Sequence, residues 1–229
     1  MASVLLIRHG QASFGTADYD RLSPLGEEQS RRLGRWLKQT GSAPDLVVVG
    51  PRHRHAHTAD LCVEAAGVTA PRITIAGLDE FDHEEVLARY RPDLASHDAL
   101  MAELERLEHP HRAFQLMFSE AVARWTSNRF DREYSRSWTV FRAAVMEGVQ
   151  ALAAQEARSI WAFTSGGPIA VITNALVGAP IADAFTLSWP LVNTSTTRVS
   201  IGAQRKSLIS YNGWPHIEGA DSTDLVTYR

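Results

Sequence analysis

The sequence contains little cysteine and no long apolar segment. Its one cysteine, Cys62, has no partner within the chain for a disulfide bond, which favours a reducing compartment. The apolar run near the N-terminus, residues 3–7, is interrupted by Arg8 and is too short for a secretory signal peptide. No other run approaches the roughly 20 apolar residues that span a bilayer. These absences predict a cytoplasmic protein that does not enter a membrane.

The chain also lacks a strong excess of charge of either sign. It carries 23 lysine and arginine residues against 26 aspartate and glutamate residues, a net charge of −3 over 229 residues. This balance excludes a broad attraction to nucleic acid or to an acidic membrane surface. Any affinity for anions must therefore belong to a local site. The hydrophobic content of 45% is ample for a packed core.

Short continuous apolar runs alternate with segments of helical periodicity. Runs of this kind suit strands that are covered on both faces. The predicted strands are residues 3–8, 45–50, 72–76, 159–164, 196–201 and 207–212. Between them, apolar residues at helical spacing predict helices over residues 23–41, 52–66 and 138–152. The alternation predicts one α/β domain over residues 1–229, a three-layer α/β/α sandwich with a mostly parallel central sheet.

Residues 83–130 break this rhythm and are predicted to form a helical insertion. Leu100, Leu104 and Leu107 indicate one helix, which Pro110 stops before a second helix begins. The insertion is the expected source of substrate selectivity, although its charged side chains also suit solvated helix surface. The candidates are Arg89, Tyr90, Arg91, Arg112 and Arg124.

Ligands of such sheets bind outside the carboxyl ends of the strands, where two stretches draw attention. "RHGQ" ends the first strand and places Arg8 beside His9, with Gly10 allowing close approach to the backbone. These residues suit an anion-transfer site, or else they are solvated or cap a helix. In "AFTSGGPIA", a buried strand turns sharply into a helix at Ser165, which suits either a nucleophile or part of an anion cradle.

The end of the second strand carries three alternating histidines, His53, His55 and His57. In a strand this HxHxH pattern would place three metal ligands on one face. The following residues read as a helix, however, where positions two apart point in different directions. A metal site is therefore not expected. Arg54 would lie in the first turn of that helix, where backbone N–H groups also favour an anion.

The third strand is followed by an acidic stretch, "GLDEFDHEE", at residues 77–85. A solvated acidic loop is one interpretation of this pattern. In the other, one carboxyl group near two arginines and a histidine acts as general acid for a leaving alkoxide.

Taken in order, these motifs resemble the histidine phosphatase superfamily, which includes the cofactor-dependent phosphoglycerate mutases. The matching stretches are "RHG" at 8–10, "LSPLGEEQ" at 22–29, "PRHRHAHTA" at 51–59, "LDE" at 78–80, "TSGGPI" at 164–169 and "NTSTTRVS" at 193–200. The resemblance implies that His9 attacks phosphorus and becomes a phosphohistidine. Aligning the family's SPLxRAxxTA motif on Pro51, Thr58 and Ala59 assigns the second phosphate-binding arginine to Arg54.

The resemblance also implies the remaining roles. Arg8 is the first phosphate-binding arginine, and the proton donor is Glu80, with Glu84 as the alternative. Gly10, Gln11, Ser165 and Gly166 would complete the phosphate pocket. Two fixed guanidinium groups can stabilise the charge on a transferring phosphoryl group, so the scheme needs no metal ion and no cofactor. The expected partners are a small phosphorylated substrate or ligand and, in a homodimer, a second copy of the chain.

The chain departs from the family pattern at two positions. The family's "THGG" turn carries a histidine where this chain has Ser165, and Gly15 stands where an asparagine is frequent. A serine hydroxyl is shorter than an imidazole and cannot carry positive charge, so His53, His55 and His216 are considered as compensating groups. The first prediction is a phosphomonoester hydrolase. The alternative is a weak or inactive pseudophosphatase, and a phosphoglycerate mutase is third.

Overall fold

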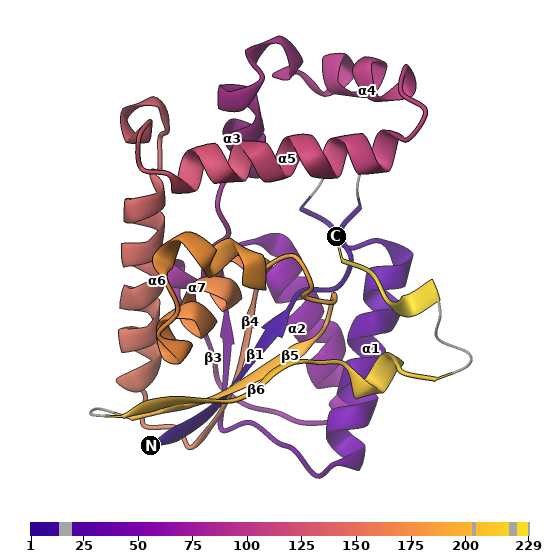
Figure 1. Ribbon diagram of the computed structural model, residues 1–229. Coiled ribbons are helices and arrows are strands. Elements are labelled where there is room, and N and C mark those ends of the chain that lie inside the picture. Colours follow the sequence, from indigo (N-terminus) through magenta and orange to yellow (C-terminus); the bar gives the residue numbers. More distant parts are fainter. Residues whose placement is uncertain (14–19, 203–204, 220–223, 229) are drawn as a thin grey trace. The chain divides into compact units, whose positions relative to one another are not determined.

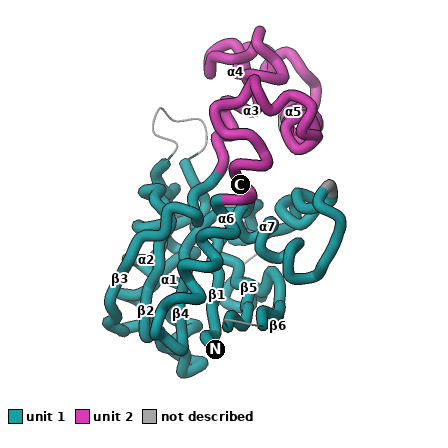
Figure 2. Tube along the Cα trace, turned by 90° about the vertical axis from the view of Figure 1, so that its left-hand side faces the viewer, with its two compact units in different colours: residues 1–80, 144–229 teal, residues 81–143 magenta. Residues whose placement is uncertain are grey.

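The computed structural model describes residues 1–13, 20–202, 205–219 and 224–228, apart from the side chains of His111 and Ala182. Gly15 lies outside the described residues. The chain divides into two compact units, coloured separately in Figure 2. We call residues 1–80 with 144–229 the sheet unit, and Phe81–Ala143 the helical unit. The insertion predicted at residues 83–130 falls within the helical unit.

The sheet unit is built on six strands in the described part of the chain. They are β1 (Ala2–Arg8), β2 (Leu46–Val49), β3 (Arg72–Thr74), β4 (Ser159–Thr164), β5 (Thr196–Ile201) and β6 (Lys206–Gly213). Their order across the sheet is β3-β2-β4-β1-β5-β6. The first four are parallel to one another, and β5 runs antiparallel to both β1 and β6. This arrangement confirms the predicted α/β fold with a mostly parallel sheet.

Helices cover both faces of this sheet. The α-helices are α1 (Pro24–Gln39), α2 (His53–Ala66), α3 (His83–Tyr90), α4 (His97–Glu105), α5 (Pro110–Thr126), α6 (Trp138–Ala153) and α7 (Gly166–Val177). In Figure 1, α1 and α2 lie on one side of the sheet, and α7 lies on the other with the part of α6 that belongs to the sheet unit. None of the described helices combines the length and apolar character needed to cross a bilayer.

The core beneath α1 and α2 explains why the strands read as continuous apolar runs. Alternate residues of β1, β2 and β4 meet the inner faces of both helices in one buried cluster. Its members are Leu5, Ile7, Leu33, Leu37, Val47, Val49, Ala59, Cys62, Ala66, Trp161 and Phe163. The intervening residues, such as Val4 and Leu6, are fully buried toward the opposite face. Burial also raises the pKa of the Cys62 thiol, so this cysteine is an unreactive core residue.

Local signals at the ends of α1 match its observed limits. Ser23 caps the helix by accepting a hydrogen bond from the Gly26 N–H at 3.0 Å. After the helix, Gly41 adopts a left-handed conformation, with φ of 67°, that suits glycine. By contrast β3 ends at Thr74, before the predicted residue 76, because a 3-10 turn over Ala76–Leu78 follows.

The helical unit packs around an aromatic cluster of its own. The rings of Phe81 and Trp125 lie 4.9 Å apart between centroids, and those of Trp125 and Trp138 lie 5.3 Å apart. The predicted helix through Leu107 is too long, because α4 ends at Glu105 and the side chain of Leu107 is exposed.

The acidic stretch that one interpretation took for a loop continues into a helix. In the helical unit, Asp82 caps α3 by accepting from the Glu85 N–H at 2.9 Å, and Glu84 and Glu85 lie in the first turn. Acidic side chains in a first helical turn favour helix formation through the helix dipole. The Asp-x-x-Glu spacing is therefore the signal that predicts this helix.

Candidate active site

His9 occupies the carboxyl end of the central strand β1, between β4 and β5. Only 5% of its surface is exposed. Its backbone N–H donates to Thr164 O at 2.9 Å, and its carbonyl oxygen accepts from Asn193 Nδ2 at 3.1 Å and from the Thr194 N–H at 3.2 Å. Hydrogen bonds to the segments that follow β4 and precede β5 therefore hold the backbone of His9 in place at the sheet edge.

The hydrogen bond of the His9 ring determines which nitrogen carries the proton. Nδ1 lies 2.7 Å from the carbonyl oxygen of Gly10. A carbonyl oxygen only accepts, so Nδ1 is the protonated nitrogen in the neutral ring. Nε2 consequently keeps its lone pair, which is the electronic state that a nucleophile needs.

Burial and positive charge keep this ring neutral. Burial, followed by the charges of Arg54 and Arg8, holds the pKa of His9 well below its ordinary value of 6.5. Each of these effects disfavours the protonated ring. The lone pair on Nε2 is therefore available at neutral pH.

Arg54 lies in the first turn of α2, where the sequence predicts it, and only 4% of its surface is exposed. Its Nη1 donates to the Asp20 carboxylate at 2.9 Å. The same carboxylate accepts from the backbone N–H of His53 at 2.8 Å. The N-terminus of α2 and Arg54 thus already bind an anionic group, and they supply the donors and positive charge that a phosphoryl oxygen would require. Asp20 was not foreseen from the sequence.

Arg8 extends from the end of β1 toward the C-terminal segment. Its Nη2 donates to the carbonyl oxygen of Tyr228 at 2.9 Å, and its Nη1 donates to that of Leu191. The guanidinium also lies near the start of α7, since a Cβ added to Gly166 would be 3.9 Å from Arg8 Nε. Two carbonyl contacts fix the orientation of the guanidinium group.

The N-terminus of α7 forms a further wall of the site. Ser165 is the N-cap residue of this helix and is fully buried. The backbone N–H of Gly167, in the first turn, donates to Glu80 Oε2 at 3.2 Å. An acidic group at a helix N-terminus is favourable, and the contact brings the carboxyl group predicted as proton donor to the turn that carries Ser165.

The segment that carries Glu80 is anchored on both sides. Arg52 donates to Asp79 Oδ1 at 2.6 Å and to the carbonyl oxygen of Glu80 at 3.2 Å. On the other side, Thr164 donates its hydroxyl to Leu78 O at 2.7 Å. Glu80 is therefore held against α2 and β4 within the sheet unit. Glu84, the alternative donor, belongs to the helical unit.

The sequence marked His55 as one of three alternating histidines and as a group that could compensate for Ser165. Its Nε2 lies 2.6 Å from the Ser165 hydroxyl oxygen, and neither residue has any exposed surface. Its ring centroid lies 5.8 Å from that of His9. Burial, followed by the charge of Arg54, lowers the pKa of His55 well below 6.5, so this ring is neutral as well.

Gly10 and Gln11 join the site edge to α1. A Cβ on Gly10 would lie 2.4 Å from the carbonyl oxygen of Gly26, so only glycine permits this close approach. The Gln11 N–H donates to Gln29 Oε1 at 2.9 Å, and the Gln11 side-chain oxygen accepts from the Ser23 hydroxyl at 2.8 Å. These contacts connect Gly10 and Gln11 to α1. Phosphate binding by the two residues stays a prediction.

The HxHxH stretch lies on a helix, as its flanking residues predicted. His55 points to Ser165, while the rings of His53 and His57 lie together, 5.8 Å apart between centroids. Among the described residues, no group of three or more histidine, cysteine, aspartate or glutamate side chains is arranged to hold a metal ion.

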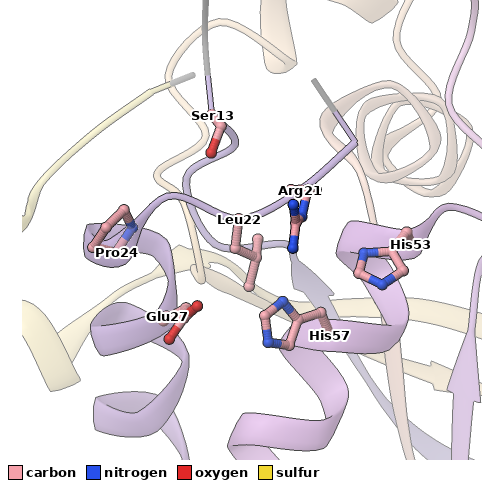
Figure 3. A pocket seen from close by; sticks show the side chains of 7 residues that line it. All are labelled: Ser13, Arg21, Leu22, Pro24, Glu27, His53 and His57. Carbon is pink, nitrogen blue, oxygen red and sulfur yellow. The ribbon is translucent and has the colours of Figure 1, made fainter. Parts of the chain in front are cut away.

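A pocket of about 370 Å³ lies near the N-terminal ends of α1 and α2 (Figure 3). It is lined by Ser13, Arg21, Leu22, Pro24, Glu27, His53 and His57. Its described lining includes neither His9 nor Ser165, so it is not the cluster just described. Arg21, His53 and His57 give part of its lining a basic character.

The fold and the buried polar cluster define a class, α/β proteins whose ligand site lies at the carboxyl edge of a mostly parallel sheet. Within that class, the chain belongs to the histidine phosphatase superfamily (branch 1), whose family model matches residues 4–213. A 2,3-bisphosphoglycerate-dependent phosphoglycerate mutase of Thermobifida fusca (strain YX) is 39% identical over 75 residues. That match covers 30% of this chain and 30% of the mutase.

Solved structures of similar fold include both phosphatases and a mutase. The alpha-ribazole phosphatase of Shigella flexneri has a TM-score of 0.63 at 19% identity, over 92% of this chain and 96% of that one. A mycobacterial glucosyl-3-phosphoglycerate phosphatase has a TM-score of 0.62 at 20% identity, over 93% and 99%. A phosphoglycerate mutase from Bacillus anthracis str. Sterne has a TM-score of 0.64 at 15% identity, over 94% of each chain. At these identities the likeness shows a shared fold.

Proposed function

We propose that the protein is a metal-independent phosphomonoester hydrolase that acts through a phosphohistidine on His9. The observation that carries the proposal is the state of the His9 ring. It is buried and neutral, with Nδ1–H directed to Gly10 O at 2.7 Å and the lone pair therefore on Nε2. Membership of the histidine phosphatase superfamily supports the same assignment.

The first half of the proposed reaction transfers the phosphoryl group to the enzyme. His9 Nε2 forms a bond to phosphorus as the bond from phosphorus to the leaving oxygen breaks. Glu80 gives its proton to that oxygen, which leaves as an alcohol. Arg8, Arg54 and the N-terminus of α7 stabilise the negative charge on the phosphoryl oxygens.

The second half regenerates the enzyme. Water attacks phosphorus, the bond between phosphorus and nitrogen breaks, and the Glu80 carboxylate takes a proton from the water. Inorganic phosphate leaves, and His9 and Glu80 return to their starting states. No step requires a metal ion or a cofactor. Dividing the displacement at His9 replaces one difficult step with two easier ones.

A phosphate ester of a small molecule is the proposed substrate class. Solved proteins of similar fold are named for such compounds, alpha-ribazole and glucosyl-3-phosphoglycerate phosphatases among them. The cytoplasmic location and the homodimer stay predictions.

A pseudophosphatase that binds a phosphorylated ligand without turnover is the second candidate. Two observations favour it: the Ser165 hydroxyl contacts His55, and the Gly10 N–H donates to Thr58 Oγ1 at 3.1 Å. The Ser165 hydroxyl and the Gly10 N–H would each have to donate to a phosphoryl oxygen although they already contact these partners. A phosphoglycerate mutase is proposed least, because Ser165 is a weaker group for stabilising the transferring phosphoryl than the family histidine.

The first prediction concerns hydrolysis of an aryl phosphate in the presence of EDTA. We expect turnover by the wild type and none above background for His9→Ala, because the variant has no nucleophile. An alkaline quench during turnover, followed by mass spectrometry, should find one phosphoryl group on His9. Equal inactivity of the two proteins, with phosphate still raising the melting temperature of the wild type, would support the pseudophosphatase instead.

A further inference from the structure

His55 and Ser165 form a buried polar pair from two different elements. His55 projects from the first turn of α2, and Ser165 precedes α7, 110 positions later in the chain. Their 2.6 Å separation is short for a hydrogen bond between a ring nitrogen and a hydroxyl. Both side chains are wholly buried, so water does not compete for either group.

The Ser165 hydroxyl does not perform the usual task of a serine at its position. A serine before a helix normally accepts a hydrogen bond from a backbone N–H of the first turn. Ser165 is the N-cap of α7 and makes no such bond. Its hydroxyl oxygen instead lies 2.6 Å from His55 Nε2, which indicates that the pair has a purpose other than helix capping.

The backbone of the sheet unit is shaped to admit the imidazole. Gly50 directly follows β2, and a Cβ there would lie 2.4 Å from His55 Nδ1 and 2.4 Å from the carbonyl oxygen of Leu78. Any other residue at position 50 would displace the ring of His55, the backbone at Leu78 or both. The SPLxRAxxTA motif that identified Arg54 has alanine at the next position, where this chain has His55. This chain thus has an imidazole on α2, at His55, and a serine in the β4–α7 turn, at Ser165, where the family has its histidine.

The pair lies directly beside the proposed nucleophile. The His55 and His9 ring centroids are 5.8 Å apart, and the charge of Arg54 acts on both rings. A phosphoryl group on His9 Nε2 would therefore lie among His55, Ser165 and Arg54. The serine is shorter than an imidazole and needs its hydroxyl hydrogen directed at the phosphoryl oxygen to donate to it.

We propose that His55 is a positioning residue for phosphoryl transfer and acts through Ser165. In this proposal the neutral His55 ring carries its proton on Nε2 and donates it to the Ser165 oxygen, so that the serine hydrogen is directed to an oxygen of the phosphoryl group. The two side chains together perform the task of one long donor in the β4–α7 turn. The inference rests on the proposed function, because it assigns His55 to the same phosphoryl pocket.

The decisive experiment moves the imidazole from one side of the pair to the other. It compares wild type with His55→Ala, Ser165→His and the double variant, using steady-state hydrolysis of an aryl phosphate. We expect His55→Ala to lower kcat about 10²-fold, the scale of one lost transition-state donor, with KM changed less than about threefold. Ser165→His alone should also be impaired, because two imidazoles would compete for one buried space.

The double variant should recover kcat to within about tenfold of wild type, because its imidazole again reaches the phosphoryl group. A merely structural role for His55 would not produce this recovery. His57→Ala, which removes a histidine from the same helix without touching Ser165, is the matched control and should equal wild type. The inference is overturned if His55→Ala keeps wild-type kcat, or if the double variant is no more active than His55→Ala.

A variant of closer shape covers the case in which His55→Ala does not fold. His55→Gln keeps an N–H donor near the position of Nε2, and we expect it to retain kcat within about tenfold of wild type. A folded His55→Gln protein whose kcat falls 10²-fold or more would contradict the donor role. A phosphoryl group found on Ser165 during turnover would also contradict it, since His55 would then be the base for a serine nucleophile.

Failure of the hydrolase assignment is recognised separately. If the wild type neither hydrolyses the ester nor forms a phosphohistidine, the proposed function is wrong, and His55 is then judged by calorimetric binding of orthovanadate. We expect binding to weaken about tenfold in His55→Ala and to recover in the double variant. Equal orthovanadate affinity in wild type and His55→Ala would overturn the inference without reference to turnover.

Discussion

Polar residues are arranged in opposite ways in the sheet unit and the helical unit. At the sheet edge, His9, Arg54 and His55 are 5%, 4% and 0% exposed. In the helical unit, Arg91 pairs with Asp93 at 2.6 Å, with side chains that are 36% and 60% exposed. Exposed ion pairs contribute little to stability, whereas burying polar and charged groups has a large desolvation cost. Such a concentration of buried polar groups therefore indicates a functional site.

The contrast also clarifies the arginines that were candidates for substrate selectivity. Arg124 donates to Glu133 at 2.6 Å and to the Tyr134 hydroxyl at 2.7 Å, and Arg89 lies 3.5 Å from Glu85. These partners belong to the helical unit itself. The interpretation as solvated helix surface accounts for Arg89 and Arg91 without invoking a substrate.

The largest difference between the units is expected from two arginine substitutions. Arg54→Ala should lower kcat/KM for an aryl phosphate about 10³-fold, because a buried guanidinium next to the transferring group is lost. Arg91→Ala should change kcat/KM less than about threefold. Steady-state kinetics of both variants, with melting temperatures to check folding, provide the measurement. Similar losses in the two variants would remove the functional distinction between the units.

A pair of glutamates gives the next largest contrast. Glu80→Gln should lower kcat about 10²-fold for an alkyl phosphate, whose leaving oxygen needs a proton, and much less for a nitrophenyl phosphate. Glu84→Gln, in the helical unit, should leave both rates near wild type. Measuring kcat on the two esters tests the assignment. If Glu84→Gln shows the dependence on leaving group instead, the alternative proton donor is correct.

The smallest of the three effects concerns stability and is expected at His216. Its Nε2 lies 2.8 Å from Thr194 Oγ1, and burial, with the charge of Arg32, lowers the pKa of its ring from 6.5 to about 4. Below pH 6.5 the unfolded chain binds a proton that the folded protein does not, so acid destabilises the fold. Because of this side chain, the free energy of unfolding should fall by about 2 kcal/mol between pH 7 and pH 5.

Urea unfolding of His216→Gln at the two pH values measures this contribution. On acidification, the free energy of unfolding of the variant should fall by about 2 kcal/mol less than that of wild type. The matched control is His97→Gln, at an exposed position of α4 in the helical unit, which should lose as much stability as wild type. An identical pH dependence in wild type and His216→Gln would show that His216 does not titrate in this way.

Much of the sheet unit was predictable because its signals are local. Five of the six described strands were located to within about a residue at each end, and continuous apolar runs marked the buried strands β1, β2 and β4. Ser23 and Gly41 marked the ends of α1 for equally local reasons. The errors occurred at the ends of elements, as at Leu107, which lies beyond the end of α4 at Glu105.

The family, the fold and the expected nucleophile could be inferred from sequence because each is signalled by short motifs of neighbouring residues, such as Arg8, His9 and Gly10. The contacts of Ser165 and Arg54 could not. Ser165 meets His55 across 110 positions, and Arg54 meets Asp20 across 34. Such pairs form only when the parallel sheet brings the ends of β1, β2 and β4 to one edge. Helical spacing from Ala59 and Cys62 places His55 on the buried face of α2, but only the folded sheet brings it to Ser165.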